Sequence, residues 1–91
     1  MASHFVYVLV CSDGTLYTGY TTDLDRRLRQ HNAGKGARYT RLRTPVKLAF
    51  KERFHMRSNA LRREIQIKRM SRSSKLLLCA GYPLKPGQSP S

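Results

Sequence analysis

The first apolar runs of the chain have the pattern of a β-hairpin. Residues 5–11 (FVYVLVC) and residues 16–19 (LYTG) are of strand length, and residues 12–14 (SDG) between them are a turn signal. A two-residue loop would place Tyr7 and Tyr17 on opposite faces of this hairpin. A three-residue loop, with its glycine in the left-handed conformation, would make the two tyrosines diagonal neighbours on one face. The pattern leaves both registers open.

Helical patterns and one further strand follow the hairpin. Thr22 or Asp23 caps a helix that continues to about Asn32 and ends before Gly34, a residue typical of helix C-termini. The later segments are, in order, a Gly- and Arg-rich loop at 34–44, a strand at 46–53, a helix at 59–70 capped by Ser58, and a short helix within 71–79 anchored by the leucines at 76–78.

The element order ββαβα(α) predicts an α+β fold. A three-stranded sheet with helices covering it is the economical way to bury these apolar stripes. Residues 1–80 are expected to form a single domain. Residues 81–91 are rich in Pro, Gly and Ser, and we expect a disordered tail there.

The charge of the chain narrows the class of partner. Eighteen Lys and Arg residues face five Asp and Glu residues, for a net charge of +13. A nucleic-acid backbone is the usual polyanion that such a chain meets, because each neutralised phosphate releases a counterion. We expect no membrane role and a cytoplasmic location, since no apolar run nears the ~20 residues of a spanning helix and no export signal is evident. Cys11 and Cys79 are expected to be reduced and packed, and no zinc-ligand spacing is present.

Carboxylates are scarce, and only one lacks a local explanation. Four of them fit a turn, a helix start or a strand flanked by basic residues: Asp13, Asp23, Asp25 and Glu52. Glu64 falls about 40° from Ala60 on a helical wheel, inside the apolar arc of its helix. A carboxylate there is costly unless it is paired or binds a cation. A salt bridge to Lys68, one turn on, is the alternative explanation.

The first helix carries a second pair of candidate residues. Arg27 and His31 are four residues apart and share one flank of the apolar stripe. An arginine held beside the core can grip a phosphate with its planar fork. The alternatives are a solvated basic face and, for His31, a half-buried histidine with satisfied hydrogen bonds.

Residues 17–31 (YTGYTTDLDRRLRQH), with VYV at 6–8 before them, resemble the GIY-YIG endonuclease domain. The loop GKGARYTRLRTP at 34–45 and ALRREIQIK at 60–68 resemble the short, stand-alone bacterial branch of YhbQ-like proteins. The resemblance covers about residues 5–78. It implies a three-stranded antiparallel sheet flanked by helices, and phosphodiester hydrolysis with one divalent ion, Mg²⁺ or Mn²⁺.

The resemblance also implies roles for individual residues. Tyr7 and Tyr17 are its paired site tyrosines, Arg27 contacts the scissile phosphate, His31 completes the catalytic group, and Glu64 binds the metal. We expect further nucleic-acid contacts from one strand and from the basic loop, at Gly19, Tyr20, Lys35, Arg38, Tyr39, Arg41 and Arg43. Tyr20 stands where many family members have a lysine.

These expectations describe an endonuclease of DNA, favoured over RNA, that is structure-selective or weakly sequence-specific, as in DNA repair. No base-reading element is evident, so a protein partner could supply sequence specificity. The apolar stripes of the predicted helices and strands fit a monomer. The alternatives are a nucleic-acid-binding module with little or no cleavage and a structural protein of a ribonucleoprotein particle.

Overall fold

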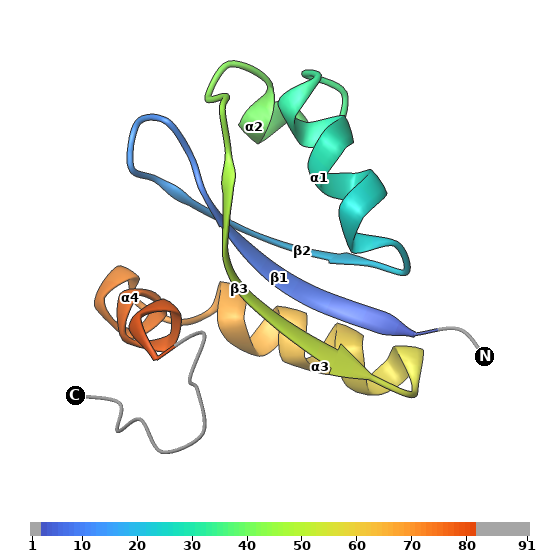
Figure 1. Cartoon of the computed structure of the whole chain (residues 1–91). Helices are drawn as coiled ribbons and strands as arrows, with labels where there is room; N and C mark the ends of the chain where they lie inside the picture. Colours follow the sequence, from blue (N-terminus) through green and yellow to red (C-terminus); the bar gives the residue numbers. More distant parts are fainter. Residues whose placement is uncertain (1–2, 82–91) are drawn as a thin grey trace.

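A three-stranded antiparallel sheet forms the centre of the protein (Figure 1). The computed structural model describes residues 3–81. The strands are β1 (His4–Val10), β2 (Leu16–Thr21) and β3 (Lys47–Phe54), in the spatial order β2-β1-β3. β1 is central because its apolar, β-branched residues can be buried on both faces. The predicted α+β fold with order ββαβαα is thus confirmed, apart from one extra turn of helix.

The hairpin has the three-residue loop of the two that the pattern allowed. The Cys11 N–H donates to the Thr15 carbonyl at 2.8 Å, and Gly14 has a φ of 84°, in the left-handed region. Tyr7 therefore pairs with Gly19 and Leu9 pairs with Tyr17. The two tyrosines are diagonal neighbours on one face of the sheet.

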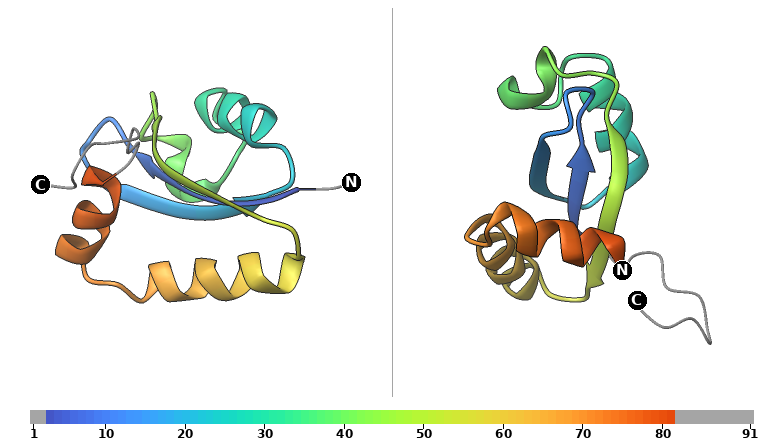
Figure 2. Two further views of the ribbon diagram at one scale, coloured as in Figure 1. Left: turned by 60° about the horizontal axis from the view of Figure 1, so that its bottom comes forward. Right: turned by 90° about the vertical axis from the view of Figure 1, so that its left-hand side faces the viewer.

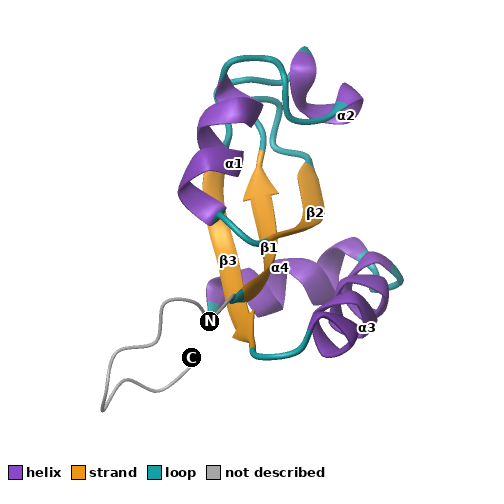
Figure 3. Ribbon diagram, turned by 90° about the vertical axis from the view of Figure 1, so that its right-hand side faces the viewer, coloured by secondary structure: helices purple, strands orange, loops and turns teal. Residues whose placement is uncertain are grey.

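Helices cover both faces of the sheet (Figures 2 and 3). One face carries α1 (Leu24–Asn32) and α2 (Arg38–Arg41), and the other carries α3 (Arg57–Lys68), with α4 (Arg72–Ala80) beside the hairpin end. The alternation of β1 divides the core accordingly. Val6 and Val8 pack with α3, whereas Tyr7 and Leu9 pack on the α1 side.

Helix starts differ from the prediction in two places. The segment 34–44, expected to be a loop, contains the single turn α2. The helix predicted to start after Ser58 begins at Arg57, since Met56 is extended and its carbonyl accepts from the Ala60 N–H at 3.2 Å. Asp23, rather than Thr22, caps α1 by accepting from the Arg26 N–H at 3.1 Å.

The anchor of α4 is smaller than predicted. Leu76 is exposed and Leu77 is 75% exposed, whereas Leu78 and Cys79 pack on the core. The reason is that only one side of this short helix meets the sheet. Cys11 and Cys79 are free thiols, as predicted. The tail expected at 81–91 lies outside the described residues from 82 onward, and no helix within 3–81 is long and apolar enough to cross a bilayer.

Candidate functional site

Tyr7 crosses the sheet toward its β2 edge, and Gly19 makes this possible. A Cβ atom built on Gly19 would lie 2.5 Å from the Tyr7 Cζ and closer still to its hydroxyl oxygen. No larger residue fits beneath the ring in this position. Gly19 is therefore required for packing, and it brings the Tyr7 hydroxyl over the backbone of β2.

A chain of buried hydrogen bonds continues from Tyr7 to the second helix. The Tyr7 hydroxyl lies 2.9 Å from His31 Nε2, and His31 Nδ1 lies 2.7 Å from the Thr40 hydroxyl. The Thr40 hydroxyl also donates to the Ala37 carbonyl at 3.2 Å. Tyr7, His31 and Thr40 are all buried. His31 is thus a buried histidine with both ring nitrogens satisfied, the alternative considered for it from sequence.

Burial and nearby charges favour the neutral forms of both Tyr7 and His31 in this series of hydrogen bonds. Burial, then the Tyr17 phenol, raise the pKa of the Tyr7 hydroxyl above its usual range, with Glu64 adding to the rise and Arg27 opposing it. Burial, followed by the Arg27 charge, lowers the pKa of His31 below its usual value. At neutral pH, Tyr7 remains a hydroxyl and His31 remains uncharged.

Tyr17 lies among three aromatic rings with its hydroxyl unoccupied. Its ring centroid is 5.3 Å from that of His31, 6.4 Å from that of Tyr7 and 5.9 Å from that of Tyr39, which is stacked on it at 26°. Within residues 3–81 its hydroxyl makes no hydrogen bond. The hydroxyl is therefore available to a ligand.

Arg27 completes this group from α1. It is half-buried, its charge acts on both Tyr7 and His31, and its side chain makes no ion pair within the described part of the chain. It lines a polar hollow of about 300 Å³ with its neighbours Thr21, Thr22, Asp23, Arg26 and Gln30. A half-buried guanidinium without a carboxylate partner is suited to bind a phosphate.

Glu64 approaches from the opposite face of the sheet. It lies between Ala60 and Ile67, the two buried residues of α3, and its side chain is 17% exposed. Arg63 pairs with Glu52 of β3 at 2.9 Å. One residue along a helix turns by about 100°, so Glu64 projects from a different side of α3 than Arg63.

Both explanations for Glu64 hold together in the structure. The carboxylate faces inward as the helical wheel predicts, and it also pairs with Lys68 at 3.3 Å. Residues 3–81 contain no cluster of three His, Cys, Asp or Glu side chains. A lone, partly buried carboxylate still fits Mg²⁺, which often takes one protein carboxylate and completes its shell with waters and phosphate.

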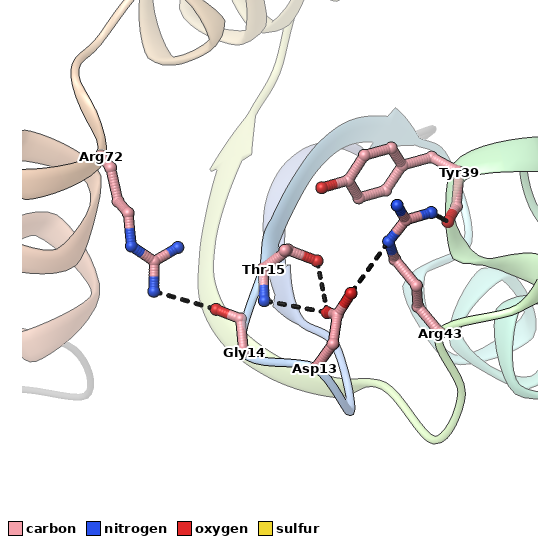
Figure 4. Close-up of polar contacts among 6 residues, drawn as sticks. All are labelled: Asp13, Gly14, Thr15, Tyr39, Arg43 and Arg72. Atoms are coloured by element: carbon pink, nitrogen blue, oxygen red, sulfur yellow. Dashed lines mark hydrogen bonds and ion pairs between the residues drawn. The ribbon is translucent and has the colours of Figure 1, made fainter.

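The basic loop divides into free and engaged cations. Lys35, Arg38 and Arg41 line a hollow of about 310 Å³ and make no ion pair among the described residues. Arg43 is instead engaged: it pairs with Asp13 at 3.1 Å, donates to the Tyr39 carbonyl at 2.8 Å and stacks 4.2 Å from the Tyr39 ring (Figure 4).

Residues at the tip of the β1–β2 hairpin support the contact between Arg43 and Tyr39. Asp13 accepts from the Thr15 N–H and hydroxyl, and these bonds, ahead of the Arg43 charge, hold the pKa of its carboxyl below the usual value. Arg72 of α4 donates to the Gly14 carbonyl at 3.1 Å (Figure 4). Arg43 thus acts in the structure as a support for Tyr39.

Tyr20 lies apart from the other predicted residues. Its ring is on the α3 face, where it stacks on His4 at 5.9 Å and its hydroxyl lies 2.7 Å from His4 Nδ1. The alternation of β2 explains this, since Tyr20 follows Gly19 and precedes Thr21. Thr40 and Gly36 both contact His31, although the sequence did not single out either residue. Their signal in the sequence is weak: a threonine and a glycine within a basic segment.

Comparisons with known proteins show the family of the chain. The model of the GIY-YIG catalytic domain matches residues 3–77. A UPF0213 protein of Halobacterium salinarum is 61% identical over 72 residues, which are 79% of this chain and 94% of that protein. A UPF0213 protein of Staphylococcus haemolyticus is 54% identical over 76 residues, 84% of this chain and 93% of that one.

Two solved structures have the same fold. The solution NMR structure of a UPF0213 protein from Bacillus halodurans is 47% identical, with a TM-score of 0.57 over 89% of this chain and 88% of that one. A solution NMR structure of a protein from E. faecalis is also 47% identical, with a TM-score of 0.58 over 82% of this chain and 80% of that one. Together with the match over residues 3–77, they show that the chain belongs to the GIY-YIG catalytic domain family, in its small UPF0213 branch.

Proposed function

We propose that this protein is a divalent-metal-dependent endonuclease that hydrolyses phosphodiester bonds in DNA, with structure-selective or weakly sequence-specific action. The observation that carries the proposal is the convergence of four groups at the β2 edge. The Tyr7–His31 hydrogen bond, the free Tyr17 hydroxyl and the unpaired Arg27 lie together, in a family whose domain is a nuclease domain.

Tyr7 and Tyr17 have different roles toward the attacking water. Tyr7 stays protonated because burial raises its pKa, so it orients its neighbours through hydrogen bonds. The Tyr17 hydroxyl has no other partner among the described residues and takes the position of the group that binds and activates the water. His31 holds the Tyr7 ring through its hydroxyl.

Arg27 and a metal ion held at Glu64 would stabilise the negative charge on the phosphate. Arg27 grips the scissile phosphate and stabilises the charge that develops on it. Glu64 would hold one Mg²⁺ or Mn²⁺, an ion that supplies Lewis-acid stabilisation when bound. Its present partner, Lys68, is 53% exposed and can release the carboxylate at small cost.

The basic loop supplies the wider contact with the substrate. Lys35, Arg38 and Arg41 are free to neutralise backbone phosphates. Tyr39 is 40% exposed and adds a further contact with the substrate, although its ring already contacts Tyr17 and Arg43. Such contacts carry little sequence information. We therefore infer a preference for branched or single-stranded DNA, or a partner protein that directs the enzyme.

A cleavage assay tests the proposal. The protein is incubated with single-stranded, duplex, flap and junction DNA and with matching RNA, in Mg²⁺, Mn²⁺ or EDTA. Cleavage of at least one DNA form, lost in EDTA and lost in Tyr17→Phe and Glu64→Gln, is expected. Glu52→Gln is the matched control, because Glu52 pairs with Arg63 at 2.9 Å on the β3 side of α3.

Two results would contradict the proposal. Full cleavage by both variants would show that contaminating nuclease, or another site, is responsible. Binding of every DNA form without cleavage under any metal would instead identify the protein as a binding module, whose affinity falls steeply with salt.

A further inference from the structure

Thr40 is buried in the middle of a surface segment that is otherwise polar and basic. It is the one buried residue of α2 and has no exposed surface. Its hydroxyl lies 2.7 Å from His31 Nδ1 and 3.2 Å from the Ala37 carbonyl. A valine would fill the same volume, so packing alone does not explain a hydroxyl here.

The direction of each hydrogen bond in this chain follows from the carbonyl at its end. A carbonyl oxygen only accepts, so the single proton of the Thr40 hydroxyl is donated to Ala37. Thr40 then accepts in its contact with His31, so Nδ1 carries the ring proton. Since His31 is neutral, Nε2 is bare and accepts the proton of the Tyr7 hydroxyl.

We propose that Thr40 is a positioning residue that selects the Nδ1-protonated tautomer of His31 and thereby sets the direction of the Tyr7 hydroxyl. With its proton directed at His31, the Tyr7 oxygen presents its lone pairs outward. It can then accept a hydrogen bond from the Tyr17 hydroxyl or from the attacking water. With the other tautomer, Tyr7 would accept from His31 and donate outward, which reverses the polarity of the site.

The same contact couples the substrate surface to the site. Gly36 packs closely against His31, since a Cβ there would lie 2.5 Å from the His31 Cγ. Lys35, Arg38 and Arg41, the free cations, lie in the same short segment as Gly36 and Thr40. Phosphates bound by these cations would hold the segment against His31. This catalytic consequence rests on the proposed nuclease function, whereas the tautomer does not.

The test reads the tautomer directly. Protein labelled with ¹⁵N-histidine is examined at pH 8 by long-range ¹H–¹⁵N correlation, and His31 is identified by the signal missing in His31→Gln. We expect a protonated Nδ1 and a bare Nε2 in the wild type and in Thr40→Ser. In Thr40→Val and Thr40→Ala, which lack the acceptor, the Nε2-protonated form should appear.

A matched control is available in Thr18, whose buried hydroxyl has no hydrogen-bond partner within residues 3–81. Thr18→Val removes the same kind of group from β2, where Thr18 pairs with Val8, and should leave the His31 tautomer unchanged. In cleavage assays, Thr40→Val should lower kcat about tenfold with little change in KM, and Thr40→Ser should restore it.

The outcomes separate this inference from the proposed function. A wild-type His31 protonated at Nε2, or an unchanged tautomer in both Thr40→Val and Thr40→Ala, overturns the inference even if the protein cleaves DNA. The expected tautomer shift in a protein that cleaves nothing supports the positioning role and rejects the nuclease. If the valine variant does not fold, the wild-type spectrum and the alanine variant decide.

Discussion

Replacing Gly19 with alanine should destabilise the protein, because the added methyl group meets the Tyr7 ring. The new Cβ would lie 2.5 Å from the Tyr7 Cζ. Carbon atoms in contact prefer about 3.5–4.0 Å, so the overlap is about 1 Å. Tyr7 belongs to the central strand and is paired on both sides, with Gly19 and with Lys51, so its backbone cannot move aside freely.

The cost follows from similar overpacked cores. Forcing one methyl group into a packed site costs about 1–3 kcal/mol. For a domain of this size each kcal/mol lowers Tm by about 4–8 °C, so Gly19→Ala should lower Tm by roughly 5–20 °C. Urea unfolding followed by circular dichroism measures the free energy, and a thermal melt measures Tm.

Two variants make the test specific. Gly81→Ala is the matched control, because a Cβ at Gly81 meets only atoms at 3.7 and 3.8 Å, an ordinary contact. It should leave Tm unchanged or slightly raised. In a Tyr7→Leu background the ring is gone, so Gly19→Ala should cost little there. Equal costs in both backgrounds, or a wild-type Tm in Gly19→Ala alone, would refute the packing argument.

Three further outcomes are expected. Folding stability should fall as pH drops below about 6.5, because the unfolded chain then protonates His31, whereas burial lowers the pKa of His31 in the folded state. Thermal melts across pH should show a smaller dependence of stability on pH in His31→Gln. Arg41→Gln should weaken DNA binding and reduce the log–log salt slope by about 1, whereas Arg43→Gln should change the slope less, because its guanidinium already pairs with a carboxylate; titrations at several salt concentrations check this. Lys68→Met should raise the apparent Mg²⁺ affinity by removing the cation that competes for Glu64, and an unchanged metal dependence of cleavage would show that the pair does not compete.

Local rules account for most of the predicted secondary structure. The Ser-Asp-Gly turn and the Asp23 cap depend on near neighbours in the chain, so they can be predicted from the sequence. The start of α3 differs from the prediction because Ser58 is a typical cap, whereas Met56 takes that position without a side-chain bond. The core stripe of α4 is smaller than predicted because a run of leucines does not show which of them meets the sheet.

Some residues of the candidate site could be predicted from the sequence and others could not. Glu64 could be predicted, because a carboxylate within an apolar helical stripe is conspicuous when so few carboxylates exist. Tyr7 and Tyr17 could be proposed as a pair, but their common face depended on one residue of loop length. Thr40 gave no signal, since its partner His31 lies nine positions away and meets it only through the packing of α1 against α2.

By itself, the sequence determined that the chain is basic, that it folds as ββαβα with a short further helix, and that it carries the residues of the GIY-YIG pattern. These features follow from charge count, from residue periodicity and from short motifs, none of which requires knowledge of distant contacts. Only the tertiary structure decided that Arg43 supports Tyr39 rather than standing free, and that Tyr20 faces away from Tyr7. The physical reason is the same in both cases: the partner, Asp13 for Arg43 and His4 for Tyr20, lies far away in the chain, and only the packed sheet and its helices determine which contact forms.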